Sequence, residues 1–384
     1  MMMKKNIKLA FVTQFPIDAN RPLGGVEAVS VNLVDSLSKY SELQIDVVTL
    51  CSAVKDIVVE ACGNVKIHRL PKPTGSELVN AIGKSKKLIE DYIQELQSDL
   101  IHAHDTYGIM VKDIDIAKAF TVHGFIYGDT LLSSGKFRWL RSKVWEKIEK
   151  GSWAKQPNII SISPYVRERV SSVSNAIIYD IDNPISDAFF QLLRDENNGR
   201  IFTSAVISPR KNTLQLVKAV KLLVDDNINV ELHIAGNVGD QLYMQKMMDF
   251  IQQHQLDKHV KILGRISTQE VMQELAQSSI YALASLEENS PMGIEEAMAV
   301  GIPVVTSNRC GMPYMVKNGE TGYLINPFDE QDIASKFKRI LSNSELKQAM
   351  SKKSIELALD LYHSESVARR TYAVYQELLL AKER

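Results

Sequence analysis

Short apolar runs alternate with longer amphipathic segments along the whole chain. The runs that predict strands before residue 190 are 7–13, 45–50, 65–69, 98–103, 118–122 and 158–162. Between them, 26–40 and 76–96 have the spacing of helices. Strands that alternate with helices are typical of parallel sheets with helices on both faces.

The pattern is interrupted between residues 183 and 200 by the polar stretch NPISDAFFQLLRDENNGR, and then resumes. The predicted strands after it are 201–207, 230–235, 259–263, 279–285 and 303–307. The predicted helices lie near 212–225, 239–254, 268–277 and 291–300. We therefore predict an α/β protein with two similar Rossmann-type domains, 1–186 and 187–363, whose ligands bind at the carboxyl ends of the strands and between the domains.

Composition narrows the class of protein. The chain has 384 residues and a formal net charge of -1, so it lacks the overall positive charge that would attract nucleic acid. Three widely spaced cysteines form no CxxC pair, which argues against a zinc site or a disulfide framework and fits a reducing compartment. No apolar run reaches the ~18 residues of a membrane span. We expect a cytoplasmic protein, with peripheral contact at the inner face of the membrane left open.

The stretch EENSPMGIEEAMAVGIPVV, residues 287–305, has the features of a ligand-binding site. Ser290 is a good N-cap, Pro291 a good first helical residue and Gly301 a good terminator, so a helix start at a sheet edge offers N–H groups to a phosphate. Glu288 before it and Glu296 within it are acceptors for hydroxyls, which suits a nucleotide sugar. The alternative is that both are solvated surface acids, as we expect of Glu287 and Glu295.

The stretch SLEENSPMGIEEAMAVGIPVVTS resembles the signature of glycosyltransferase family 4: two Glu separated by seven residues, then Ala-Met-Ala, a Gly and a Pro-Val-Val strand. PLGGVEAVSVNLVDSLS resembles the family's Gly-Gly loop and helix. DLIHAHD and TVHG look like its acceptor-domain strand ends, and SPRKNTLQLVKAV like its phosphate-binding lysine region. The resemblance covers nearly the whole chain. It implies the GT-B fold, with two facing domains, a cleft between them, and a terminal helix within 364–384 that crosses back to the first domain.

The resemblance also implies roles for single residues, with the acceptor bound by the first domain and the donor mostly by the second. Lys211 would contact the diphosphate, with backbone N–H groups at Gly24 and Gly25. Glu296 would accept the ribose hydroxyls, and Glu288 would bond the donor sugar. His123, after the strand that ends in Val122, would bond the transferred sugar near its reacting centre.

Three positions depart from the family's pattern. Ala205 and Val206 stand where Gly-Arg is usual, and Arg210 is a candidate for the missing charge. Pro291 replaces a glycine and has no N–H, so Met292 and Gly293, beside Ser290, must supply the donors at the helix start. Tyr314 stands where a glutamate is common. These departures bear on the donor contacts more than on the fold.

The reaction that the resemblance implies is sugar transfer with retention, without a metal or a cofactor, in polysaccharide or glycolipid synthesis. The donor is a nucleotide diphosphate sugar, with UDP favoured and GDP next, and the acceptor is a saccharide or a lipid-linked sugar. The acceptor hydroxyl would pass its proton to the leaving diphosphate on the same face of the sugar. Two alternatives stay open: a UDP-sugar epimerase or hydrolase of the same fold, and an inactive nucleotide-sugar-binding protein.

Two further features carry predictions about the first domain. We expect His102 and His104 to face opposite sides of their strand, with His104 and Asp105 at its end as candidates for lining an acceptor site. Segment 136–155 holds all three tryptophans and seven basic residues against two acidic ones. Its apolar positions Leu140, Val144 and Ile148 predict an amphipathic helix docked on its own sheet, and contact with an anionic membrane surface is the alternative.

Overall fold

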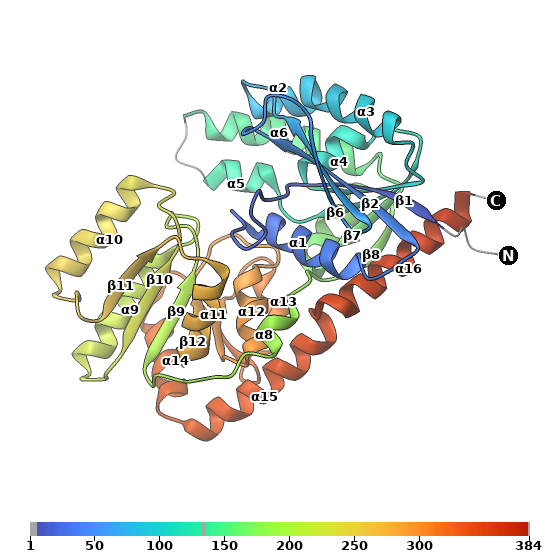
Figure 1. Cartoon of the computed structure of the whole chain (residues 1–384). Coiled ribbons are helices and arrows are strands. Elements are labelled where there is room, and N and C mark those ends of the chain that lie inside the picture. The colour runs from blue at the N-terminus through green and yellow to red at the C-terminus, as the bar shows by residue number, and fades with distance from the viewer. Residues whose placement is uncertain (1–5, 133–135, 383–384) are drawn as a thin grey trace. The chain divides into compact units, whose positions relative to one another are not determined.

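The computed structural model describes residues 6–132 and 136–382, so the first five residues of the chain lie outside the described part. The chain divides into two compact units (Figure 1). The first comprises Met1–Tyr127, Trp139–Pro184 and Ser364–Arg384, and the second comprises Gly128–Arg138 and Ile185–His363. Each unit is built around its own sheet.

The first sheet has the strand order β3-β4-β2-β1-β5-β6-β7-β8, and all pairs are parallel except β3 with β4. Its strands are β1 (Ile7–Val12), β2 (Leu43–Cys51), β3 (Val58–Cys62), β4 (Val65–Pro71), β5 (Leu100–His104), β6 (Ala117–Val122), β7 (Asn158–Ser161) and β8 (Ile177–Asp180). On β1, Leu9 and Phe11 belong to one apolar cluster and Ala10 and Val12 to another. This central strand is therefore buried on both faces, as expected of a parallel sheet.

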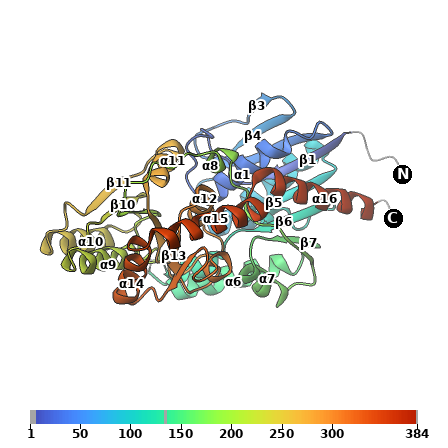
Figure 2. The ribbon, with the colours of Figure 1, turned by 90° about the horizontal axis from the view of Figure 1, so that it is seen from below.

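Helices cover both faces of the first sheet. They are α1 (Gly25–Leu37), α2 (Glu77–Ile82), α3 (Lys84–Leu96), α4 (Thr106–Val111), α6 (Arg138–Trp153), α7 (Pro164–Ser171) and α16 (Ser364–Lys382). Helix α5 (Ile126–Leu132) begins in the first unit, and its residues from Gly128 on belong to the second. Helices α1 and α16 pack together over one face, where Figure 2 shows α16 passing β5 and β6. Helices α3, α4, α6 and α7 pack over the other face. The last helix of the chain is thus part of the first unit.

The second sheet is parallel throughout, with the order β11-β10-β9-β12-β13-β14. Its strands are β9 (Arg200–Ser204), β10 (Glu231–Ala235), β11 (Val260–Gly264), β12 (Ile280–Leu283), β13 (Val304–Ser307) and β14 (Gly322–Ile325). Its helices are α8 (Asp187–Phe190), α9 (Thr213–Asp225), α10 (Gln241–Gln253), α11 (Thr268–Gln277), α12 (Met292–Val300), α13 (Met312–Met315), α14 (Glu330–Leu341) and α15 (Ser344–Leu361). Helices α9, α10 and α14 cover one face, and α8, α11, α12 and α15 the other.

Some predicted elements differ from the observed ones. The predicted helix 76–96 is two helices, because the chain breaks at Gly83. Strand β3 was not predicted; all five of its residues are exposed, so it lacks the apolar alternation of a half-buried strand. The short strands β8 and β14 were missed as well. The prediction of parallel α/β sheets with helices on both faces is confirmed.

The predicted helix in 136–155 is present as α6, but its predicted inner face is wrong. Leu140 and Val144 are 50% and 40% exposed, whereas Trp145 and Trp153 are buried in the apolar cluster of the first unit. No helix among the described residues is long and apolar enough to cross a membrane.

Candidate functional site

The second sheet changes its winding direction between β9 and β12, which lie side by side although two strands separate them in the chain. The loop after β9 leads to α9 and contains Arg210 and Lys211. The loop after β12 leads to α12 and contains Glu288. Both loops leave the carboxyl ends of their strands, where ligands of open α/β sheets bind. We call the group Arg210, Lys211, Glu288 and Glu296 the charged edge.

Glu288 is held by two cations. Its Oε1 lies 2.5 Å from Lys211 Nζ and 3.1 Å from Arg210 Nη1. The side chains of Glu288 and Lys211 are 10% and 14% exposed, so the pair is largely shielded from water. Burial alone would raise the pKa of Glu288, but the positive charges of Lys211 and Arg210 outweigh it and lower that pKa. Glu288 is therefore ionised at neutral pH, and Arg210 points to the same place as Lys211.

The loop that carries Glu288 is held in place by hydrogen bonds from two other segments of the second unit. Arg210 Nη1 also donates to the Glu287 carbonyl, at 2.9 Å. Gly311 N donates to the Glu288 carbonyl at 2.8 Å, and Cys310 Sγ contacts Glu287 Oε2 at 3.1 Å. Gly311 and Cys310 could not be singled out from the sequence, because they follow β13, a different strand.

The predicted N-cap of α12 is wrong. Pro291 occupies that position, and no side chain caps the helix. The Ser290 hydroxyl instead donates to Glu295 Oε1 at 2.6 Å, and Glu295 is fully buried, so it is not the solvated acid that we expected. The N–H groups at Met292 and Gly293 begin the helix, as predicted from the missing N–H of Pro291. Gly301 ends it in the left-handed conformation, with φ 79°.

Gly293 brings the start of α12 close to the sheet. A Cβ at this position would lie 2.0 Å from the Tyr281 hydroxyl and 2.9 Å from Ser204 Oγ, so a larger residue would push the helix away. Tyr281 and Ser204 hydrogen-bond each other at 3.1 Å beneath it. The pattern of the sequence did not reveal this pair, since the two residues lie on different strands.

Glu296 differs from Glu288. It lies about one and a half turns into α12 and is partly buried. Burial raises the pKa of Glu296 to about 8, and no cation offsets this effect. A partly buried carboxyl with a raised pKa and no ion pair among the described residues is a candidate for binding ligand hydroxyls.

The first sheet changes direction between β1 and β5. The loop after β1 ends at Gly24, the N-cap of α1, and Gly25 begins the helix. Both glycines are exposed, and nothing lies within 4 Å of the place where a Gly24 Cβ would be. Their backbone is thus open to a ligand. His104 is the last residue of β5 and Asp105 follows it, and His123 follows the neighbouring β6.

We call His102, His104 and His123 the histidine edge. His102 and His104 lie on one face, with ring centroids 4.3 Å apart, so the prediction that they face opposite sides is wrong. Residues two apart on a strand always share a face. His104 Nδ1 lies 2.7 Å from His123 Nε2, and His102 bonds Tyr375 of α16 and Thr121 of β6.

Burial keeps the histidine edge uncharged. It lowers the pKa of His102 to about 3 and that of His123 to about 4, and it lowers the pKa of His104 well below its usual range. At neutral pH each ring is therefore neutral, with one donor and one acceptor nitrogen. Among the described residues, no group of three or more His, Cys, Asp or Glu side chains could hold a metal.

Comparison with known proteins shows which family models the chain matches. Residues 23–188 match the family model described as Glycosyltransferase Family 4, and residues 184–357 match the model described as Glycosyl transferases group 1. The two matches together span both units.

Two solved structures and one curated relative show the extent of the likeness. Sucrose-phosphate synthase from Thermosynechococcus elongatus superposes with a TM-score of 0.83 at 18% identity, covering 98% of this chain and 100% of that one. Anabaena HepE, solved with UDP and glucose, gives 0.74 at 16% identity, covering 97% and 100%. The Escherichia coli UDP-Gal:alpha-D-GlcNAc-diphosphoundecaprenol alpha-1,3-galactosyltransferase is 25% identical over 367 residues, 88% of this chain and 89% of the relative.

The two parallel sheets, the loops at their switch points and these likenesses define a GT-B glycosyltransferase. The chain belongs to glycosyltransferase family 4, as its motifs had indicated.

Proposed function

We propose that this glycosyltransferase moves a sugar from a nucleotide diphosphate sugar to a saccharide or lipid-linked acceptor, with retention of configuration, in the synthesis of cell-surface polysaccharide or glycolipid. The observation that carries the proposal is the charged edge. Lys211 and Arg210 converge on Glu288 at the switch point, and Glu296 on the next helix forms no ion pair with the described residues.

Each residue of the charged edge has a part in holding the donor. Lys211 and Arg210 offer two positive charges to a diphosphate, and the N–H groups at Met292 and Gly293 add the positive end of α12. In the free protein the Ser290 hydroxyl donates to Glu295. It can donate to the nucleotide sugar only if this hydrogen bond breaks. Glu296 accepts hydroxyls of the ribose, and Glu288 accepts hydroxyls of the donor sugar once the diphosphate draws Lys211 away.

The first unit supplies the remaining groups. Backbone N–H groups at Gly24 and Gly25 approach the diphosphate, and His123 bonds the transferred sugar. His104 and Asp105 were predicted to line the acceptor site; His104 is 1% exposed, so a direct acceptor contact would need its surroundings to open. Their acceptor role stays a prediction.

The transfer proceeds on one face of the sugar. The bond from the anomeric carbon to the diphosphate oxygen breaks, the bond to the acceptor oxygen forms, and the acceptor proton passes to the diphosphate oxygen. Charge builds up on the departing diphosphate, where Lys211 and Arg210 stabilise it, and positive charge from the protein takes the place of a metal. We propose that neither a metal nor a cofactor is required.

UDP is the favoured base and GDP the next. HepE was solved with UDP, and the E. coli relative is named for a UDP-sugar donor and a lipid-linked acceptor. These names support a UDP-sugar and a lipid-linked acceptor for this chain as well.

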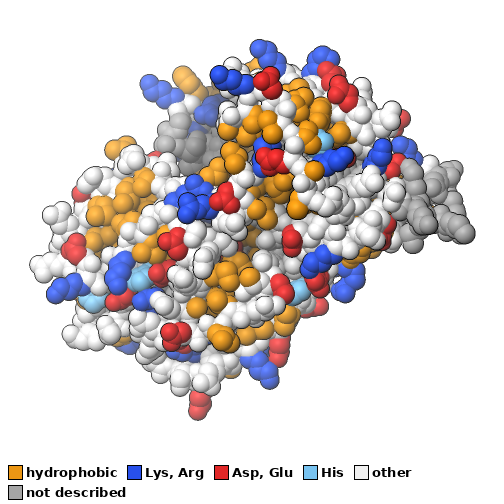
Figure 3. Space-filling view, viewed as in Figure 1, with side chains coloured by type: hydrophobic (Ala, Val, Ile, Leu, Met, Phe, Trp, Pro, Cys, Tyr) orange, Lys and Arg blue, Asp and Glu red, His pale blue; other side chains and the backbone are white. Residues whose placement is uncertain are grey.

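The exposed side of α6 supports contact with an anionic membrane surface. On α6, Trp139 and Leu140 are 63% and 50% exposed, and Arg138, Arg141 and Lys147 are exposed near them. Phe137, just before the helix, is 71% exposed. Figure 3 shows hydrophobic side chains and basic ones sharing the surface of the first unit. Exposed aromatic and basic residues on one helix suit the boundary between lipid headgroups and acyl chains.

Nucleotide release tests the donor. UDP-glucose, UDP-galactose and GDP-mannose are incubated with the enzyme, with EDTA and with added Mg²⁺, in the presence and absence of a saccharide acceptor. We expect one donor to release nucleotide only with acceptor, equally with EDTA, and the Glu296→Ala variant to lose binding of that nucleotide. Release of free sugar or an epimer without acceptor would favour a hydrolase or epimerase, and binding without turnover an inactive binding protein.

Flotation with vesicles tests the membrane contact. We expect vesicles of phosphatidylglycerol, but not of phosphatidylcholine, to carry the protein, and the double variant Trp139→Ala/Leu140→Ala to release it. Leu242→Ala is the matched control, because Leu242 is 77% exposed on α10. Equal flotation of all variants would contradict the assignment to α6.

A further inference from the structure

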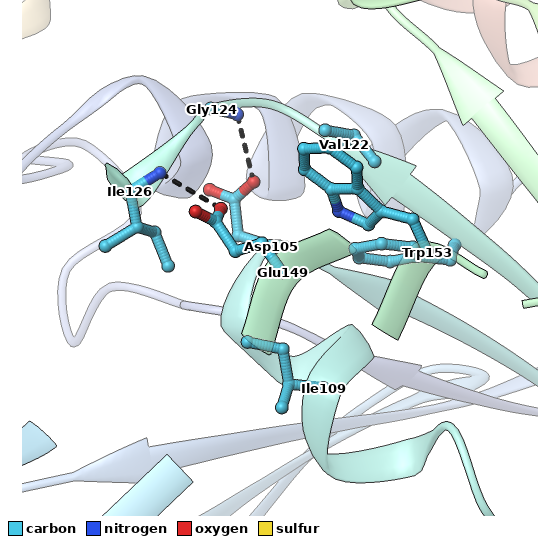
Figure 4. A pocket seen from close by; sticks show the side chains of 8 residues that line it. Asp105, Ile109, Val122, Gly124, Ile126, Glu149 and Trp153 are labelled. Carbon is cyan, nitrogen blue, oxygen red and sulfur yellow. Dashed lines mark hydrogen bonds between the residues drawn. The ribbon is translucent and has the colours of Figure 1, made fainter. Parts of the chain in front are cut away.

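The segment that follows β6 is held by two carboxylates from other parts of the first unit. Asp105 Oδ1 accepts from His123 N at 2.9 Å and from Gly124 N at 3.2 Å. Glu149 of α6, 4% exposed, accepts from Ile126 N at 3.0 Å and from Tyr127 N at 2.9 Å. Figure 4 shows both carboxylates pointing at this backbone. The backbone of residues 123–127 is therefore fixed at both ends.

The ring of His123 is oriented separately, by His104. The planes of the two rings differ by 13°, and their centroids are 5.0 Å apart. With Nδ1 of one ring 2.7 Å from Nε2 of the other, this is the geometry of an edge-to-edge hydrogen bond that lies in the plane of both rings. Such a bond restrains rotation about χ2 of His123, which a bond out of the plane would not do.

The direction of this bond follows from the other nitrogens. His104 Nε2 is buried and has no hydrogen-bond partner in the described part of the chain. A buried N–H without an acceptor is rarer than a bare acceptor, so the proton of His104 belongs on Nδ1, where it can be donated. Burial keeps the ring of His123 neutral, so a ring that accepts at one nitrogen carries its proton on the other. His123 then carries its proton on Nδ1 and accepts at Nε2.

We propose that His104 is a positioning residue whose Nδ1–H donates to His123 Nε2, fixing both the ring plane and the Nδ1–H tautomer of His123. This inference rests on the proposed function, in which His123 contacts the transferred sugar. His104 itself, 1% exposed, is placed to act through His123 rather than on a substrate. A sugar hydroxyl that bonds His123 thus meets a ring with a known donor and a known acceptor, instead of a mixture of two tautomers.

Nitrogen NMR of the whole enzyme, labelled with ¹⁵N-histidine, tests the bond without any substrate. The chain has eight histidines, and comparison with His123→Gln identifies the signals of His123. We expect His123 to be neutral and protonated on Nδ1 from pH 6 to 8, and His104→Leu to convert it to a mixture of tautomers. A wild-type His123 protonated on Nε2 would overturn the inference.

Kinetics with a matched pair of variants tests the consequence. In His104→Asn the amide can still donate from near the position of Nδ1, whereas His104→Leu has a similar shape and no donor. We expect His104→Leu to lower kcat by about 10–100-fold with KM for the donor nearly unchanged, and His104→Asn to restore most of it. Equal kcat for the two variants, or a His123→Ala variant as active as wild type, would overturn the positioning role.

The two failures can be told apart. If the wild-type enzyme transfers no sugar from any of the donors, the proposed function fails and the positioning role fails with it, while the NMR signals still decide whether the hydrogen bond exists. If transfer is observed and only the His104 variants behave alike, the proposed function stands and this inference alone is wrong. Thermal unfolding of both variants shows whether a loss of kcat merely follows a loss of folded protein.

Discussion

The charged edge of the second unit and the histidine edge of the first solve the same problem differently. Both place titratable side chains out of water at the carboxyl ends of parallel strands. At the charged edge, Glu288 keeps its charge because Lys211 and Arg210 lie against it. At the histidine edge, burial lowers the pKa of His102 and His123 to about 3 and 4, so both rings are uncharged at neutral pH.

The difference matches two kinds of ligand chemistry. A diphosphate needs positive charge, and in the proposed function Lys211 and Arg210 provide it beside the N-terminus of α12. Hydroxyls of a sugar need donors and acceptors with fixed directions, which neutral imidazoles held by other side chains provide. In the proposed function, the paired charges of Lys211, Arg210 and Glu288 serve the diphosphate and donor hydroxyls, whereas the neutral ring of His123 serves hydroxyls of the transferred sugar.

The largest expected effect comes from removing the main cation. Lys211→Ala should lower the rate of transfer by about 100–1,000-fold, since a lost stabilising group for transition-state charge is worth about 3–4 kcal/mol. The rate of nucleotide release in the presence of acceptor measures it. Lys246→Ala, which removes an exposed lysine of α10, is the control and should leave the rate unchanged. If Lys211→Ala lost less than about 3-fold, the diphosphate would not lie at the charged edge.

The next effect separates the two glutamates by their response to pH. Glu296 has a pKa of about 8 in the folded protein against an ordinary 4.5, so the folded state binds its proton more tightly. Between these values the wild type loses stability as pH rises, by up to about 1.4 kcal/mol per unit. Glu296→Gln removes this loss, and at pH 8 it should be about 2 kcal/mol or more above wild type in urea unfolding.

Glu288→Gln should respond with the opposite sign. The folded state holds Glu288 ionised, so its contribution is present above the ordinary pKa and is lost in acid. At pH 8 the variant should be about 2–3 kcal/mol less stable than wild type, because two cations lose their carboxylate. Above pH 7 the buried histidines are neutral in both states and do not disturb the measurement. Two variants that shifted in the same direction would break the distinction between Glu288 and Glu296.

The sequence could predict the charged edge better than the histidine edge. Lys211 and Glu288 follow apolar runs that were assigned as strands, and ends of parallel strands gather at one sheet edge, so their proximity follows from topology. Glu295 could not be told from a surface acid, because its burial and its bond to the Ser290 hydroxyl arise only from tertiary packing. The bond between His104 and His123 depends on which strands are neighbours, and nothing in the spacing of 19 residues encodes that.

The prediction of strands and helices from the sequence has the same limit: it misses features that depend on tertiary contacts. Strongly apolar central strands such as β1 and β13 were found from their composition, whereas β3 was missed because it is exposed along its whole length and exists only through pairing with β4. The tyrosine that links α16 to the sheet was also missed. Tyr375 lies 273 residues from its partner His102, and an apolar helix face gives no sign that one of its rings carries a needed hydroxyl.

The smallest expected effect concerns that tyrosine. Tyr375 is fully buried, and its hydroxyl lies 2.6 Å from His102 Nδ1. Tyr375→Phe leaves this buried nitrogen without a partner and should cost about 1–2 kcal/mol in urea unfolding at pH 7. Tyr372→Phe on the same helix is the control. Its hydroxyl donates to Glu42 Oε1 at 2.9 Å in a partly buried contact, so water can replace it, and the cost should stay below about 0.5–1 kcal/mol. Equal costs would mean that the neutral network of the histidine edge adds nothing to the anchoring of α16 beyond apolar packing.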